Sequence, residues 1–139
     1  MTRSVAQKMG VRDGSRAFFD NDPPGAIAAI ALPELDVRPR LSGEFDYIHC
    51  FCVTEAQVRD RLPKLKRHLK ASGMLWLSWP KGRQLGSDLA LPKVIEIGYD
   101  HGLVESTTLR VDDTWSAIKF THPKKGKVYR NRYGKLPQR

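Results

Sequence analysis

The sequence predicts an α/β fold in which helices cover both faces of a mostly parallel sheet. The first observation is a strand–helix–strand unit, with strands at Phe45–Val53 and Met74–Trp79 and a helix at Thr54–Ser72. Strands joined by a helical crossover must run parallel. The second observation is that the strand at Phe45–Val53 is largely apolar on both faces, as a strand covered on two sides is. The third is a pair of alternating segments, Leu103–Val111 and Trp115–His122, which predicts a C-terminal antiparallel hairpin.

The N-terminal third predicts short elements separated by glycine and proline. A proline ends a helix at the preceding residue and cannot donate a hydrogen bond in a central strand, so prolines mark element ends and sheet edges here. The expected elements are a helix at Val5–Met9, a strand at Arg16–Phe19, a loop at Asp20–Gly25, a helix at Ala26–Leu32 and an edge strand at Leu35–Arg38.

Local signals delimit the central helix. Thr54 and Gln57 fit a capping box at its start, and Gly73 is expected to cap its end in a left-handed conformation. Its apolar residues recur at helical spacing: Val58, Leu62, Leu65 and Leu69. After a polar connection, Pro92 suits the first turn of another helix, which is expected to end near Gly102.

Composition and charge favour a single globular domain with a basic extension. The chain has 139 residues, of which 40% are hydrophobic, and a net charge of +9. Seven of these charges lie in the last residues, so we divide the chain into a domain at 1–122 and a tail at 123–139. The N-terminus has no signal-peptide pattern and the chain has no apolar run that could span a membrane, so we expect a cytoplasmic protein.

Cysteine and histidine give no evidence for a metal site. Cys50 and Cys52 lie two apart on one expected strand, where strand geometry should hold them too far apart to form a disulfide. We expect both to be buried thiols. His49 lies on the same strand and is expected to be a hydrogen-bonded core residue.

The order of elements, β-α-β-β-α-β-α-β-β, resembles a class I methyltransferase-like Rossmann domain, a three-layer sandwich whose last two strands form a hairpin. The segment from Phe45 to Pro80 is also similar to the stretch of those enzymes in which the helix ends in "L-K-x-G-G". Three further segments, GMLWLSWPKG, HGLVES and DDTWSAIKF, resemble a small bacterial family of uncharacterised proteins with the pattern "LWVSWPK…GLVD…WSGLK". This second resemblance implies the same architecture and no particular activity.

Several features argue against S-adenosylmethionine as a cofactor. A methyltransferase needs glycines after its first strand, where its backbone approaches the cofactor closely. Here the loop Asp20–Gly25 has one glycine and two prolines, and the expected second strand ends in basic residues. We also expect the sheet to lack one βα unit before Phe45. No cofactor is therefore predicted.

The best candidate site in the sequence follows the strand at Met74–Trp79, because α/β sheets bind ligands at the carboxyl ends of their strands. Lys81 and Arg83 could hold a phosphate or carboxylate there with backbone amides of the loop. We expect Trp115 at the opposite end of the sheet from Trp79. The ligand-binding candidates are Asp20, Gly25, Lys81, Gly82, Arg83 and Ser87.

Cations are frequent on the central helix and in the tail, where tyrosines alternate with them. Such a surface can neutralise phosphates and stack on bases. The nucleic-acid-binding candidates are Lys124, Lys125, Lys127, Tyr129, Arg130, Arg132 and Tyr133.

The leading interpretation of the sequence is a non-enzymatic binding or regulatory module with an unknown protein partner or a nucleic acid. Two alternatives stay open: an enzyme that uses S-adenosylmethionine or another small molecule, and a nucleic-acid-binding accessory protein. An enzyme would have a cavity bordered by Asp20, Gly25 and Lys81.

Overall fold

A computed structural model describes residues 4–124 and confirms the predicted order of elements. The elements are α1 (Val5–Met9), β1 (Arg16–Asp20), α2 (Ala26–Ile30), β2 (Asp36–Val37), β3 (Phe45–Phe51), α3 (Glu55–Lys66), β4 (Leu69–Pro80), a 3₁₀ segment (Lys81–Gly86), α4 (Leu91–Asp100), β5 (Val104–Arg110) and β6 (Trp115–Thr121). Within residues 4–124, no helix is long and apolar enough to cross a membrane.

The strands form one six-stranded sheet in the order β2-β1-β3-β4-β6-β5. The neighbours from β2 to β4 are parallel, whereas β6 pairs antiparallel with both β4 and β5. This confirms the predicted mostly parallel sheet with a C-terminal antiparallel hairpin. It also agrees with the expected loss of a βα unit, because β2 is an edge strand and no helix joins it to β3.

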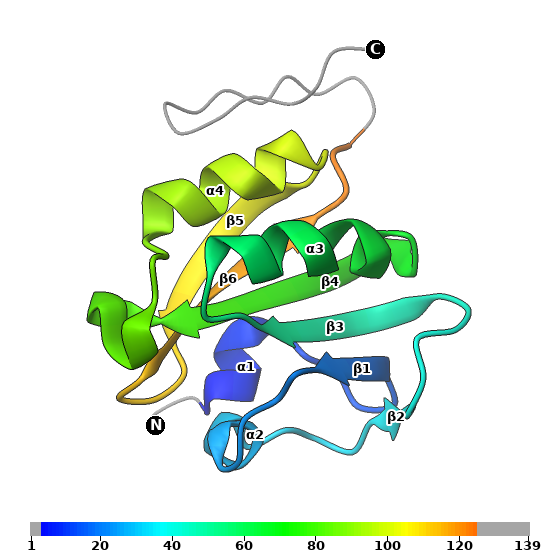
Figure 1. The fold of residues 1–139 in the computed structure, drawn as a ribbon. Coiled ribbons are helices and arrows are strands. Elements are labelled where there is room, and N and C mark those ends of the chain that lie inside the picture. The colour runs from blue at the N-terminus through cyan, green and yellow to red at the C-terminus, as the bar shows by residue number, and fades with distance from the viewer. Residues whose placement is uncertain (1–3, 125–139) are drawn as a thin grey trace.

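Helices cover both faces of the sheet, so the domain has three layers (Figure 1). A hydrophobic cluster lies on each face of the sheet. On one face α3 and α4 contribute Val58, Leu62 and Val94 to a core with Leu75. On the other face α1 and α2 pack Met9 and Ile30, together with alanines, against the sheet. Each apolar side chain buried in this way stabilises the fold by about 1.5–3 kcal/mol before entropy is counted.

The central helix begins as predicted and ends earlier than predicted. The Thr54 side chain accepts a hydrogen bond from the Gln57 backbone and the Gln57 side chain accepts one in return, so the capping box is confirmed. Leu69 is the first residue of β4 instead of the last turn of α3, and Gly73 lies within that strand. A Cβ on Gly73 would come 2.8 Å from the carbonyl oxygen of Phe45. Gly73 therefore serves a close approach of two strands, and its predicted role as a helix cap was wrong.

The chain reverses its direction of travel across the sheet between β1 and β3. From β1 it passes through α2 to β2 on one side, then returns to β3 on the other side of β1. The helix that follows β1 packs on one face of the sheet and the helix that follows β3 on the other. A crevice opens beyond the strands at such a switch point, and ligands of open α/β sheets bind there.

Candidate functional site

A cavity of about 330 Å³ lies at this switch point, and we call it the switch-point cavity. Asp20 ends β1 and Phe51 ends β3, so the carboxyl ends of both strands contribute to its wall. Helix α3 provides the opposite wall. The lining residues are Asp20, Asn21, Phe51, Cys52, Gln57 and Arg61. The volume is within the range of small-molecule sites.

An ion pair between Asp20 and Arg61 crosses the wall of the switch-point cavity. Arg61 Nε donates to Asp20 Oδ2 over 2.8 Å, and a second guanidinium nitrogen donates to Oδ1. The Asp20 side chain is only 7% exposed and the Arg61 side chain 38%. The hydrogen bonds that Arg61 donates to Asp20 raise the pKa of Arg61. The cavity therefore presents a buried carboxylate and a more exposed cation side by side.

The two thiols lie beside this carboxylate, nearer to each other than predicted. Cys50 and Cys52 are free and buried, as expected, but their sulfur atoms are 3.3 Å apart. The strand ends at Phe51, so Cys52 does not follow the strand geometry on which the expected separation rested. Cys50 Sγ also donates to Asp20 Oδ2 over 3.4 Å. The hydrogen bond with Cys52, together with burial, raises the pKa of Cys50.

We expect both thiols to resist alkylation in the folded protein. Each residue is 1% exposed, and the thiolate that reacts is disfavoured at Cys50. Iodoacetamide at pH 8 should modify neither cysteine within the time that modifies both in urea, as measured by intact mass. Rapid labelling of the folded protein would show that this part of the cavity wall opens to solvent.

His49 is a structural residue, as predicted. Its ring nitrogens lie 2.7 Å from the Tyr47 hydroxyl oxygen and 2.6 Å from Ser78 Oγ. The ring stacks on Phe51 with centroids 4.4 Å apart. Burial lowers the pKa of His49 to about 3 and raises the pKa of Tyr47. His49 and its two polar partners are closed off from solvent, so this arrangement stabilises the sheet and cannot touch a ligand.

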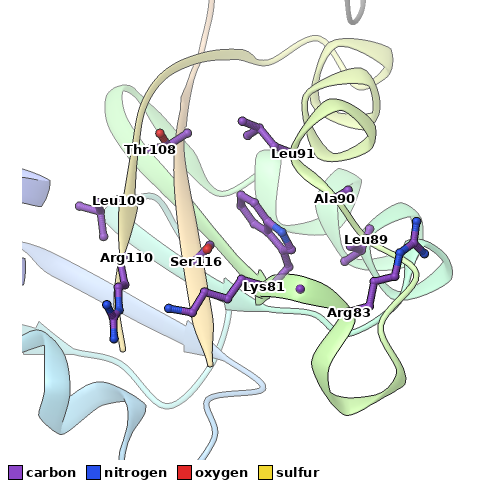
Figure 2. Close-up of a pocket in the computed structure, with 11 residues that line it drawn as sticks. Lys81, Arg83, Leu89, Ala90, Leu91, Thr108, Leu109, Arg110 and Ser116 are labelled. Carbon is purple, nitrogen blue, oxygen red and sulfur yellow. The ribbon is translucent and has the colours of Figure 1, made fainter. Parts of the chain in front are cut away.

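A second cavity, of about 480 Å³, lies between the β4–β6–β5 part of the sheet and the start of α4 (Figure 2). We call it the strand-end cavity. Figure 2 shows Lys81 reaching toward Arg110 on one side, while Arg83 lies on the other side beside Leu89. The lining residues are Trp79, Lys81, Gly82, Arg83, Leu89, Ala90, Leu91, Thr108, Leu109, Arg110 and Ser116.

The predicted ligand-binding residues are therefore divided between two places. Lys81, Gly82 and Arg83 line the strand-end cavity, whereas Asp20 lines the switch-point cavity. Within residues 4–124, Asp20 and Lys81 line different cavities, so the expected single cavity between Asp20, Gly25 and Lys81 is not supported; different strand ends carry Asp20 and Lys81. Gly25 lies at the start of α2 with φ of 84° and lines neither cavity.

Ser87 also lies outside both cavities. Its hydroxyl donates to the Val53 carbonyl over 2.6 Å and accepts from the Leu89 backbone over 3.1 Å. The side chain therefore joins the loop after β3 to the segment before α4. Ser87 positions the wall of the strand-end cavity and does not face into it.

The expected separation of Trp79 and Trp115 was wrong. The first residue of β6 pairs with the last residue of β4, so Trp115 lies opposite Pro80 at the same end of the sheet as Trp79. In an antiparallel pair the start of one strand meets the end of the other. The two indoles nevertheless belong to different hydrophobic clusters, on opposite faces of the sheet. Only Trp79 lines the strand-end cavity.

The cations of α3 are largely occupied within the fold. Arg59 pairs with Glu55 and Asp100, Lys64 pairs with Asp60, and Arg61 is held by Asp20. These pairs reduce the positive potential that a nucleic acid would meet on the helix. Of the tail candidates only Lys124 is among the described residues, and the others, from Lys125 to Tyr133, lie outside them. Among residues 4–124, no three His, Cys, Asp or Glu side chains are grouped so that they could hold a metal ion.

The sheet order and the switch point define a methyltransferase-like Rossmann fold, and solved structures support this assignment. The chain superposes with a TM-score of 0.59 on ribosomal protein L11 methylase from Lactobacillus delbrueckii subsp. bulgaricus, with 12% identity over 86% of this chain and 77% of that chain. A TehB-like SAM-dependent methyltransferase from Corynebacterium glutamicum ATCC 13032 Kitasato gives 0.54, with 14% identity over 86% and 87% of the two chains. Magnesium protoporphyrin IX methyltransferase from Synechocystis PCC 6803, with bound SAM, gives 0.55, with 10% identity over 86% and 74%.

No protein-family model and no curated protein matches the chain. The resemblance to the bacterial family of uncharacterised proteins is therefore not supported, whereas the methyltransferase-like Rossmann domain is.

These neighbours correct two predictions. The sequence favoured a non-enzymatic module without a cofactor, but the solved structures that share this fold include a methylase, a SAM-dependent methyltransferase and a methyltransferase with bound SAM. Both predictions relied on the glycine-poor loop after β1. They gave too little weight to the methyltransferase-like order of the sheet. At 10–14% sequence identity, the similarity to these structures establishes the fold alone. The cofactor and the activity of this chain are therefore treated as proposals.

Sequence reasoning found Asp20 but missed the other polar residues of the switch-point cavity, Asn21, Gln57 and Arg61. Gln57 and Arg61 were assigned only to the cap and the charged face of α3. A usable signal was present, because a helix that follows a strand directly begins beside that strand's carboxyl end. Its first two turns therefore face any ligand bound there.

Proposed function

We propose that the protein binds S-adenosylmethionine (SAM) in the switch-point cavity and is a SAM-dependent methyltransferase. The observation that carries the proposal is the position of this cavity, at the carboxyl ends of β1 and β3 in a methyltransferase-like sheet. The neighbouring structures include SAM-dependent enzymes, which supports the same cofactor.

The charges of the cavity suit the amino-acid end of this cofactor. The buried Asp20 carboxylate can accept hydrogen bonds from an ammonium group, and the Arg61 guanidinium can donate to a carboxylate. Phe51 and Cys52 supply an apolar wall. When bound, SAM would supply an activated methyl group, and these residues would bind and orient it.

The loop after β1 limits the expected affinity. Pro23 and Pro24 provide no backbone N–H groups, and Gly25 lines neither cavity. A cofactor held mainly by side chains loses the rigid donors that a glycine-rich loop gives. We therefore expect a dissociation constant of about 100 µM, which corresponds to roughly 5.5 kcal/mol of binding free energy.

The proposal is tested by calorimetric titration with SAM and S-adenosylhomocysteine. Asp20→Asn should weaken SAM binding about tenfold or more, because a hydrogen bond to a charged group contributes about 1.5–3 kcal/mol. The matched control is Asp22→Asn, which removes the same charge from an exposed neighbour and should bind like the unaltered protein. Melting curves establish that Asp20→Asn is folded.

Activity is measured as S-adenosylhomocysteine formed from SAM with a panel of thiol, amine and hydroxyl acceptors, with Asp20→Asn as the comparison. Absence of heat and of any rise in melting temperature at about 1 mM of either compound would contradict the proposed cofactor, because a ligand of the folded state must stabilise it.

A further inference from the structure

We infer that the strand-end cavity binds a small organic anion, one with a flat apolar body and a carboxylate or phosphate head. This goes beyond the proposed function, since the site is separate from the switch-point cavity and does not require SAM. Its volume of about 480 Å³ suits a ligand of this size.

The floor of the cavity is a row of side chains across three strands. Trp79 on β4 is the register partner of Ser116 on β6, and Ser116 is the partner of Arg110 on β5. Register partners project from the same face of a sheet. Leu89 and Leu91 form the apolar wall toward α4 (Figure 2). Leu91 is 38% exposed and can cover the apolar body of a ligand that lies on Trp79.

The charge of the lining favours an anion. Lys81, Arg83 and Arg110 are cations, and none of the lining residues carries a carboxylate. Lys81 Nζ donates to the Asp112 carbonyl over 2.9 Å, which leaves further N–H groups of the ammonium for a ligand. Arg110 pairs with Asp113 at the rim. Among the described residues, Arg83 has no hydrogen bond or ion pair through its side chain, so its guanidinium is available.

The start of α4 adds to this positive potential. Ala90 is the N-cap and provides no side-chain acceptor for the Leu91 and Lys93 amides, while Pro92 between them has no N–H. Ala90 and Leu91 both line the cavity. Free amides at a helix N-terminus, together with the helix dipole, attract a negative charge.

The backbone between β4 and α4 is held in an uncommon conformation. Arg83 and Leu85 have φ of 60° and 57°, in the left-handed region that side-chain-bearing residues rarely adopt. They are flanked by Gly82 and Gly86, which adopt it readily. Strained residues of this kind cluster at ligand-binding segments. Here the conformation places Arg83 at the edge of the cavity.

The test uses 2-naphthoate and 2-naphthyl phosphate as probes and uncharged 2-naphthol as their matched control. Binding is followed through the indole N–H signals of the three tryptophans in ¹H–¹⁵N spectra, assigned with Trp79→Phe. We expect the Trp79 signal to move with the anions, while Trp76, which is fully buried and donates to Met74 Sδ, stays unchanged. Naphthol should bind about tenfold more weakly than the better anion. The stronger of the two anions identifies the head group.

Three variants separate a built site from general attraction to a basic protein. Arg83→Gln should weaken anion binding about five- to tenfold and leave naphthol unaffected. Thr108→Tyr fills the cavity from an exposed strand position and should abolish binding of all three probes. Arg12→Gln removes the same charge from an exposed surface position and should change nothing.

An unmoved Trp79 signal, equal binding of naphthol and naphthoate, or an Arg83→Gln protein that binds like the Arg12→Gln control would each overturn the inference. Failure of SAM to bind would leave these outcomes unchanged, so the two proposals can fail independently.

Discussion

Replacing Gly98 with alanine is expected to destabilise the protein by about 3 kcal/mol, although alanine is the better helix former. Gly98 lies in α4 against the sheet, and a Cβ there would overlap the Cε1 and Cζ carbons of Phe120. In an exposed helix the same change would stabilise by about 1 kcal/mol. Here overpacking dominates, because Phe120 is fully buried within the core on this face of the sheet.

Urea unfolding of a double-mutant cycle tests this contact. Phe120→Leu removes the ring atoms that the new methyl group would meet, so Gly98→Ala should cost much less in that background than alone. We expect a coupling free energy of about 1–2 kcal/mol between the two positions. If the two single changes add without coupling, helix α4 can shift away from the sheet and the close packing at Gly98 is not required.

The Gly98–Phe120 contact illustrates what the sequence could and could not predict. The order of elements followed from periodicity, capping residues and prolines, all of which act within one element, and it was correct. The sequence around Gly98 did not predict its role, because the helical pattern continues through it. The glycine is needed because the Phe120 ring, on a strand later in the chain, occupies the space that a Cβ would take. Packing between elements depends on their relative positions, which periodicity does not specify.

The same distinction explains the errors. Gly73 comes after a helix in the sequence, so the local pattern predicts a helix cap. A glycine is needed there because a Cβ would clash with the carbonyl oxygen of Phe45 on the neighbouring strand. Leu69 fits the helical stripe and also fits the buried face of β4, so local pattern alone could not place the boundary. In both cases strand pairing overrides the local preference.

The candidate sites depend even more on distant contacts. Lys81 and Arg83 were found because a strand end is a local feature, and they do share a cavity. The pairing of Asp20 with Arg61 joins residues 41 positions apart in the sequence. This pairing requires a particular register of β1 on β3 and a particular angle of α3 across them. The local sequence around Asp20 or around Arg61 specifies neither.

Acid should destabilise the protein through His49. Burial lowers the pKa of the folded-state imidazole from 6.5 to about 3, and its partners Tyr47 and Ser78 offer no negative charge that would stabilise an imidazolium. Between these two pH values the unfolded chain binds a proton that the folded chain does not. Stability therefore rises with pH across this window and is fully present above about pH 7.

The expected size of this effect is about 2 kcal/mol lost between pH 7 and pH 5, and it grows as the pH approaches 3. Urea unfolding at the two pH values measures it. His49→Gln keeps a polar side chain between Tyr47 and Ser78 but does not titrate, so its stability at pH 7 should be lower and its loss on acidification about 2 kcal/mol smaller. The other three histidines, His68, His101 and His122, are present in both proteins and cancel in the comparison. Equal losses in the two proteins would mean that His49 accepts its proton in the folded state without opening the sheet, and that carboxylates elsewhere cause the acid sensitivity.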